Sequence, residues 1–551
     1  MFTAFASVRA EPPQSLLRPV DGIPVTETLP SAVTASDVPA GAEASIAALA
    51  ANAPENSKRN GLVINLMLVA TFVVFLNETI IGVALPRIMR DLRIDASTGQ
   101  WLSTGFMLTM AVVIPITGFL LQRFNTRPIF ILAMSLFSAG TLTAALAPGF
   151  ELLLVARVVQ ASGTAIMLPL LLTTVMQLVP AATRGKTMGN ISIVISVAPA
   201  IGPTIAGLIL SGLDWRWIFW IVLPIAAAAL TLGALRVHNV TVPRAVSVDY
   251  LSVVLSAFAF GGLVYGLSSL GQAAAGHATV PAWIPLAVGG ISLVLFILRQ
   301  LRLQLDDRAL LDLRTFLSRG FTISVALMAV TMGALFGTVI LLPIYMQNSL
   351  HFTPLTVGIV LLPGGLIMGL LAPIVGRLFD RVGPRPLIVP GAIVLSGVLW
   401  FMALTFTETT SFGTVLAANL LMSAALAFMF TPLFTTSLGS VKPALYSHGS
   451  ATIGTVQQVA GAAGTALFVA IYTANSIALS SSGASIEVAL AGGVRAAFMC
   501  GAIISLVAIV GAFFVPKADA DTSDSFGSGE FGGAFGEGAA VNSIAREGSN
   551  N

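Results

Sequence analysis

Two charged side chains lie well inside apolar stretches of this sequence, Glu78 in the run 62–85 and Arg157 in the run 152–178. A charge at the depth of bilayer hydrocarbon costs about 2.5 to 3.5 kcal/mol or more, so such residues usually face a wet cavity or a partner. Glu78 is the sole carboxylate in the sequence at such a position and is therefore a candidate functional residue. One alternative stays open for it: the outer end of its run is close enough for Glu78 to reach lipid headgroups.

The composition excludes several classes of protein. Of 551 residues, 56% are hydrophobic and 9% charged, with a mean hydropathy of +0.93, whereas about a quarter of the residues in a soluble domain are charged. One cysteine, Cys500, and four scattered histidines predict neither a disulfide framework nor a metal site. No phosphate-binding loop of the Walker type is present. The sequence therefore predicts a polytopic membrane protein without a cofactor. Any uphill work that it does must use an ion gradient or a partner.

Apolar runs long enough to cross a bilayer, which takes about 20 residues, define an all-α membrane protein. They are 62–85, 101–121, 128–147, 152–178, 188–212, 216–235, 250–270, 281–299, 321–345, 355–376, 386–406, 412–436, 449–476 and 494–515. Because this is an even number of spans, both chain ends lie on one side of the membrane. Most Lys and Arg residues fall in the segments on that side, so the positive-inside rule places both tails in the cytoplasm and the protein in the cytoplasmic (inner) membrane. The basic residues are thereby explained by membrane topology, and no nucleic-acid partner is expected.

A repeat divides the spans into two halves. Gly118 to Arg127, after the second span, has an echo at Gly376 to Arg385, after the tenth. Repeated halves with a site at their interface are the usual architecture of secondary transporters. The predicted organisation is a disordered tail over 1–60, an N-terminal half over 61–236, two inserted spans over 237–300, an amphipathic inner linker over 301–320, a C-terminal half over 321–516 and a disordered tail over 517–551. The charged residues among the leucines of 301–319 predict an amphipathic helix there.

Several motifs, in order and in topological place, resemble the major facilitator superfamily, specifically its fourteen-helix drug/proton antiporter branch of the EmrB/QacA type, over residues 62–515. The resemblance implies a major facilitator fold in which the two repeated loops hold the inner gate closed. The gating residues that it implies are Gly118, Gln122, Arg123 and Arg127 in one loop and Gly376, Asp380, Arg381 and Arg385 in the other. Gln122 stands where the family has an aspartate, which puts gate locking by the first loop in doubt. The alternative for Arg123 and Arg127 is that they anchor lipid headgroups.

Motifs in three spans resemble further signatures of this branch. Arg157, Gln160 and Gly163 share one face of the fourth span, and the resemblance implies that Arg157 takes part in proton coupling. The alternative is an arginine that reaches the headgroups.

In the fifth span, Pro199, Gly202, Pro203 and Gly207 resemble the antiporter motif, which favours export. The alternative is close helix packing. In the first span, Asn77-Glu78-Thr79 resembles the form that lincomycin-type exporters share. This resemblance implies that Glu78 is the proton carrier.

Polar residues in later spans also resemble this branch. Together with Asn77 and Gln160, the predicted substrate-cavity residues are Tyr345, Gln347, Gln457 and Gln458. These groups can hydrogen-bond a substrate, but they can equally bond across helices.

The sequence thus predicts a proton-coupled exporter of amphipathic or cationic small molecules that works by alternating access, and not an enzyme. Its expected partners are a small-molecule substrate, protons and the lipid bilayer, and a periplasmic adaptor stays an open question. One alternative is a dedicated exporter of a single metabolite, peptide, siderophore or lipid precursor. Another, from a different class, is a non-transporting membrane sensor or assembly protein.

Overall fold

The structure, a computed structural model, describes residues 40–240, 243, 249–274 and 280–516. The predicted tail segments 1–39 and 517–551 lie outside these residues. In the described part the secondary structure is helical and no strand occurs. Fourteen helices are long and apolar enough to cross a membrane, as the sequence predicts.

The helices of the N-terminal half and the inserted pair have the following bounds: α1 Ala40–Leu92, α2 Ala96–Arg123, α3 Thr126–Ala145, α4 Phe150–Leu178, α5 Arg184–Gly212, α6 Arg216–Arg236, α7 Tyr250–Ala274 and α8 Trp283–Leu303. Those of the C-terminal half are α9 Arg319–Asn348, α10 Pro354–Val382, α11 Arg385–Thr405, α12 Phe412–Gly439, α13 Tyr446–Ser481 and α14 Ile486–Phe513. Six described helices begin at a polar side chain that accepts a hydrogen bond from a backbone N–H of the first turn: Asp95, Asp249, Ser318, Thr353, Ser411 and Ser485. Such caps satisfy N–H groups that have no helical partner and fix where each helix starts.

The first helix starts earlier than the sequence predicts. Helix α1 begins at Ala40, so residues 40–60, which we expected to be disordered, are helical. Alanine has the highest helix propensity, and the segment from Ala40 is rich in it. The span proper covers Arg59–Leu92 and belongs to a compact unit that begins at Arg59, whereas the chain up to Lys58 forms a separate unit.

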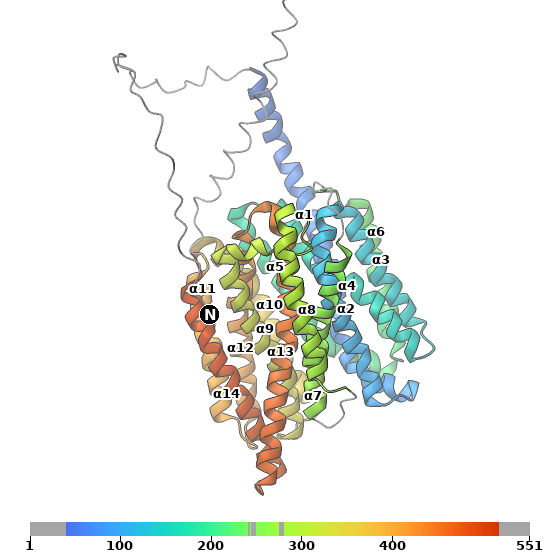
Figure 1. Ribbon diagram of the computed structural model, residues 1–551, viewed down its shortest axis with the longest axis vertical. Coiled ribbons are helices and arrows are strands. Elements are labelled where there is room, and N and C mark those ends of the chain that lie inside the picture. Colours follow the sequence, from blue (N-terminus) through green and yellow to red (C-terminus); the bar gives the residue numbers. More distant parts are fainter. Residues whose placement is uncertain (1–39, 241–242, 244–248, 275–279, 517–551) are drawn as a thin grey trace, which may run out of the picture. The chain divides into compact units, whose positions relative to one another are not determined.

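Within the unit that begins at Arg59, equivalent helices of the two halves make equivalent contacts. Helix α3 packs on α4 and α6, and in the same way α11 packs on α12 and α14. The halves meet along two seams, one between α2 and α13 and one between α5 and α10. The inserted helices α7 and α8 pack on each other, and α7 lies against α2 and α13 (Figure 1).

One end of the bundle holds the connections from α2 to α3, α4 to α5, α8 to α9 and α10 to α11. The sequence places most Lys and Arg residues at this end, which we call the basic end. The segment 304–318, which joins α8 to α9 and which we call the linker, therefore lies at the basic end.

The prediction of an amphipathic helix over 301–319 is wrong. Helix α8 ends at Leu303, and the linker consists of the short 3-10 turns Gln304–Asp306 and Leu313–Leu317 with irregular chain between them, which turns at Asp307 and bends at Leu310 and Leu311. Asp307 adopts a left-handed backbone with φ 52° and thereby ends the 3-10 turn that follows α8. The backbone N–H groups of Leu310 and Leu311 bind the side chain of Gln300 instead of helix carbonyls.

Candidate functional site

Arg157 forms the centre of a buried polar cluster in the N-terminal half. Its side chain is 2% exposed, and its Nη1 atom donates hydrogen bonds to Oε1 of Gln160 at 2.6 Å and to Oδ1 of Asn77 at 3.2 Å. The guanidinium carbon lies 4.0 Å from the centre of the Phe106 ring, a cation–π contact. Helices α1, α2 and α4 therefore all hold this one cation, and it does not reach lipid headgroups.

The same cluster continues into α3 through Gln160. This side chain is fully buried, and its Nε2 atom donates to Oγ1 of Thr141 at 2.8 Å. Helices α3 and α4 approach closely here because α4 has a glycine where it meets α3. A Cβ on Gly163 would lie 2.3 Å from the carbonyl oxygen of Ala133. The predicted pairing of Arg157, Gln160 and Gly163 on one face of the fourth span is confirmed.

Glu78 follows Asn77 on α1 but differs from it in surroundings. Asn77 is fully buried and its Oδ1 atom is bound to Arg157, whereas Glu78 is only partly buried. Among the described residues, Glu78 makes no hydrogen bond and no ion pair within 4.0 Å, although the charge of Arg157 is close enough to act on it. Among the described residues, the carboxylate is thus near a fixed cation and without a direct partner.

The predicted antiporter motif of α5 lies against this part of α1. A Cβ on Gly202 would lie 2.2 Å from Oγ1 of Thr79, the residue after Glu78, so only glycine permits this approach. Helix α5 runs through Pro199 without a break, and nothing lies within 4 Å of a Cβ on Gly207. The side chain of Pro203 lies outside the described part.

The other predicted substrate-cavity residues are not brought together with Arg157. Tyr345 is 1% exposed, its hydroxyl donates to the carbonyl of Thr407 at 2.6 Å, and Gln347 is exposed. Gln457 donates to the sulfur of Met328 at 3.3 Å, and Gln458 donates to the carbonyl of Met107 on α2 at 3.5 Å. All but Gln347 therefore bond to neighbouring protein groups, and their substrate role stays a prediction.

A cavity of about 460 Å³ lies elsewhere, between the inserted helices and the C-terminal half. Its wall is almost wholly apolar and comes from α7, α8, α9, α13 and α14, for example through Phe260, Leu293, Gly333, Phe468 and Ile504. None of the predicted site residues lines it.

Asp380 joins the two halves at the basic end. Its carboxylate accepts hydrogen bonds from the backbone N–H groups of Gly185 at 2.8 Å and Lys186 at 2.9 Å, in the first turn of α5. A Cβ on Gly376, one turn earlier on α10, would lie 2.2 Å from the carbonyl oxygen of Gly185. A carboxylate at a helix N-terminus is favourable because unpaired N–H groups and the helix dipole both attract it.

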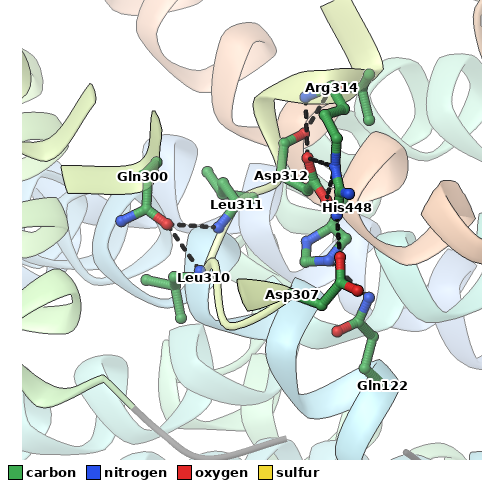
Figure 2. Close-up of polar contacts among 9 residues, drawn as sticks. Gln122, Gln300, Asp307, Leu310, Leu311, Asp312, Arg314 and His448 are labelled. Carbon is green, nitrogen blue, oxygen red and sulfur yellow. Dashed lines mark hydrogen bonds and ion pairs between the residues drawn. The ribbon is translucent and has the colours of Figure 1, made fainter. Parts of the chain in front are cut away.

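The loop after α2 occupies the equivalent place on the seam between α2 and α13. It contacts a side chain there and not backbone N–H groups. The Nε2 atoms of Gln122 on α2 and His448 on α13 lie 2.6 Å apart, a hydrogen bond (Figure 2). One turn earlier, a Cβ on Gly118 would lie 3.2 Å from that of Ala451 on α13. Gln122 and Asp380 thus play the same structural role, one neutral and one with a carboxylate.

Three of the four predicted gate arginines lie at the surface of the protein. Arg123, Arg127 and Arg381 have exposed side chains. Arg385 donates to the carbonyl of Val515, just after α14 in its own half.

Sequence reasoning missed three residues of these contacts. Thr141 anchors Gln160, Gly185 presents its N–H to Asp380, and His448 binds Gln122. His448 carried a signal, since it stands three residues into a helix whose start repeats that of α5, but the pairing depends on helix packing.

Comparison with known proteins agrees with this architecture. The family model described as Major Facilitator Superfamily matches residues 67–465. The lincomycin resistance protein LmrB of Listeria monocytogenes is 40% identical over 82% of this chain and 96% of its own length. LmrB of Bacillus subtilis is 37% identical over 86% of this chain and 98% of its own length. The multidrug resistance protein B homolog of Mycobacterium tuberculosis is 28% identical over 73% of this chain and 74% of its own length.

A solved structure shares the fold. The proton:xylose symporter XylE superposes with a TM-score of 0.57 at 14% identity, over 84% of this chain and 97% of its own. The residues that match the family model include the Arg157 cluster and both gate loops. The chain is accordingly a transporter and not an enzyme, and it belongs to the Major Facilitator Superfamily.

Proposed function

We propose that this protein is a proton-coupled exporter of amphipathic or cationic small molecules that works by alternating access. The observation that carries the proposal is the contrast between two adjacent residues of α1. Asn77 is bound to the buried Arg157, while Glu78 is partly buried and makes no hydrogen bond or ion pair with the described residues. Glu78 is the proton carrier, and Arg157 is the fixed charge near it.

The coupling follows from the exposure of Glu78 in the two states. When the site opens outwards, water reaches Glu78 and a proton binds to it. When the site opens inwards, the proton is released and the substrate binds, so that the two ligands alternate. The fraction of Glu78 that holds a proton differs between these states because burial and the distance to Arg157 both act on it.

Two arguments support the orientation of the protein in the membrane and the class of its substrates. The distribution of Lys and Arg favours cytoplasmic tails and an inner-membrane location. The relatives named for lincomycin and multidrug resistance support export of drug-like compounds. Lincomycin is therefore the first compound to test, followed by a panel of cationic dyes.

The deciding experiment measures dye and lincomycin transport in everted membrane vesicles with an imposed pH gradient. We expect gradient-dependent transport in the parent, abolition by a protonophore, and loss of coupled transport in Glu78→Gln. The matched control is Glu151→Gln, which removes an exposed carboxylate at the start of α4.

Two results would count against the proposal. Full gradient-driven transport by Glu78→Gln, present at parental level in the membrane, would remove Glu78 as the proton carrier. No transport of any compound in a broad panel by the parent would favour a narrow-substrate exporter instead.

A further inference from the structure

The two seams between the halves are held differently at the basic end. At the seam of α5 and α10, the carboxylate of Asp380 accepts two backbone hydrogen bonds. At the seam of α2 and α13, Gln122 offers a neutral amide to His448. A hydrogen bond that involves a charged group contributes roughly twice as much as a neutral one, and the side chain at position 122 brings no charge to the second seam, whereas Asp380 brings one to the first.

The linker lies on the second seam, between α2 and α13. Leu310 and Leu311 are 2% and 4% exposed and belong to one buried apolar cluster with Phe119 of α2 and Ala451 of α13. The carbonyl oxygen of Leu310 would lie 3.6 Å from a Cβ on Gly118, the residue that also faces His448 and Ala451. The linker therefore covers the point at which α2 and α13 touch.

The buried side chain of Gln300, on α8, holds the linker there. It is fully buried, and its Oε1 atom accepts from the N–H groups of Leu310 at 2.7 Å and Leu311 at 3.3 Å (Figure 2). Its Nε2 atom donates to Oγ of Ser252 on α7 at 2.7 Å. Ser252 in turn donates to Asp249, which forms a two-pronged ion pair with Arg299 at 2.6 Å.

Charged residues fix the other arm of the linker. The guanidinium of Arg314 binds the carboxylates of both Asp307 and Asp312 (Figure 2). Asp312 is 3% exposed and also caps the turn Leu313–Leu317. The chain between these anchors is therefore held in one shape, although it has no regular helix.

We propose that the linker is a latch that keeps the α2–α13 seam closed at the basic end in place of a carboxylate at position 122, and that Gln300 is its positioning residue. The inserted helices α7 and α8 then have a structural role, because they carry the polar network that holds the latch. This inference rests on the proposed alternating access, because the seam has to open at the basic end for substrate to enter.

The test measures opening of the seam directly. In a Cys500→Ser background, a cysteine is placed at Ser450, which is fully buried and accepts a hydrogen bond from Thr173 across the halves. The rate of its reaction with a charged, membrane-impermeant maleimide added to everted vesicles reports opening at the basic end. Gln300→Met keeps the side-chain volume and removes the amide, and we expect it to raise this rate about tenfold, the change that loss of one or two hydrogen bonds predicts.

Two further variants make the test specific. Gln304→Met removes the same amide one turn later, where the Oε1 atom has no partner, and should leave the labelling rate unchanged. Gln122→Asp restores the missing carboxylate next to the first turn of α13, and combined with Gln300→Met it should bring the rate back towards the parental value.

The outcomes separate the latch from the transport proposal. Equal labelling of the parent and Gln300→Met, with efflux intact, would overturn the latch alone. Faster labelling in Gln300→Met that Gln122→Asp reverses would support the latch even if no proton-coupled transport is found. Faster labelling that Gln122→Asp does not reverse would overturn the idea that the linker replaces a carboxylate.

Discussion

Asp380, on α10, accepts a hydrogen bond of 2.8 Å from the backbone N–H of Gly185, on α5, and thereby links the two halves at the basic end. The second oxygen of the carboxylate accepts from Lys186 at 2.9 Å. Polar contacts deeper in the bundle also cross the halves, from Thr431 to Ser192 at 2.9 Å and from Thr173 to Ser450 at 3.1 Å. The halves are therefore in contact at the basic end, and the proposed alternating access requires these bonds to break.

Replacement of Asp380 by alanine should weaken this closed arrangement. Both backbone hydrogen bonds to a charged acceptor are lost, which should cost the closed form about 1 to 3 kcal/mol. In the Cys500→Ser background, a cysteine at Ser192, which is 3% exposed, should then react faster with a maleimide from the basic end. Asp380→Asn keeps one acceptor oxygen and should fall between the parent and Asp380→Ala. An unchanged labelling rate in Asp380→Ala would show that the carboxylate does not hold the seam.

Close approach of α3 and α4 should make Gly163 intolerant of a side chain. A Cβ there would lie 2.3 Å from the carbonyl oxygen of Ala133, so Gly163→Ala has to push the helices apart and should cost about 1 to 3 kcal/mol. The measurement is the thermal unfolding temperature of the purified protein in detergent. Gly290→Ala, on α8, is the control because nothing lies within 4 Å of its added Cβ. Equal unfolding temperatures of the two variants would contradict the predicted crowding.

The ion pair at the start of α7 should stabilise the protein in a pH-dependent way. Hydrogen bonds from the side chain of Arg299, and to a smaller degree from Ser252, lower the pKa of Asp249 to about 2 despite its partial desolvation. In the unfolded chain an aspartate has a pKa of about 3.9. Because the folded value is the lower one, the stabilisation is complete above about pH 4 and is lost as the pH falls towards about 2.

The corresponding experiment compares the parent with Asp249→Asn. The difference in unfolding temperature should be constant near neutral pH and shrink between about pH 4 and about pH 2. Asp306→Asn is the control, because that side chain is exposed and makes no hydrogen bond or ion pair with the described residues. A difference that stays constant down to the lowest pH would mean that the charge of Asp249 does not contribute.

The sequence alone was enough for the membrane architecture. Each span is recognisable because a helix that crosses hydrocarbon has to be apolar over its own length, a property that needs no knowledge of its neighbours. The repeat from Gly118 and from Gly376 likewise predicted two repeated halves. Helical spacing placed Arg157 and Gln160 on one face, and the 2.6 Å hydrogen bond between them confirms it.

Tertiary structure alone decided the partners of these residues. Arg157 binds Asn77, 80 positions away, and Gln122 binds His448, 326 positions away, because packed helices bring them within reach. The linker also could not be predicted from its own sequence. Its leucines and charged residues predict an amphipathic helix. In the structure, the buried amide of Gln300 instead binds the N–H groups of Leu310 and Leu311 and takes the place of helical hydrogen bonds. Local pattern fixes which segments cross the membrane, whereas which polar groups meet depends on how the helices pack, since a buried polar group takes the partner that packing brings to it.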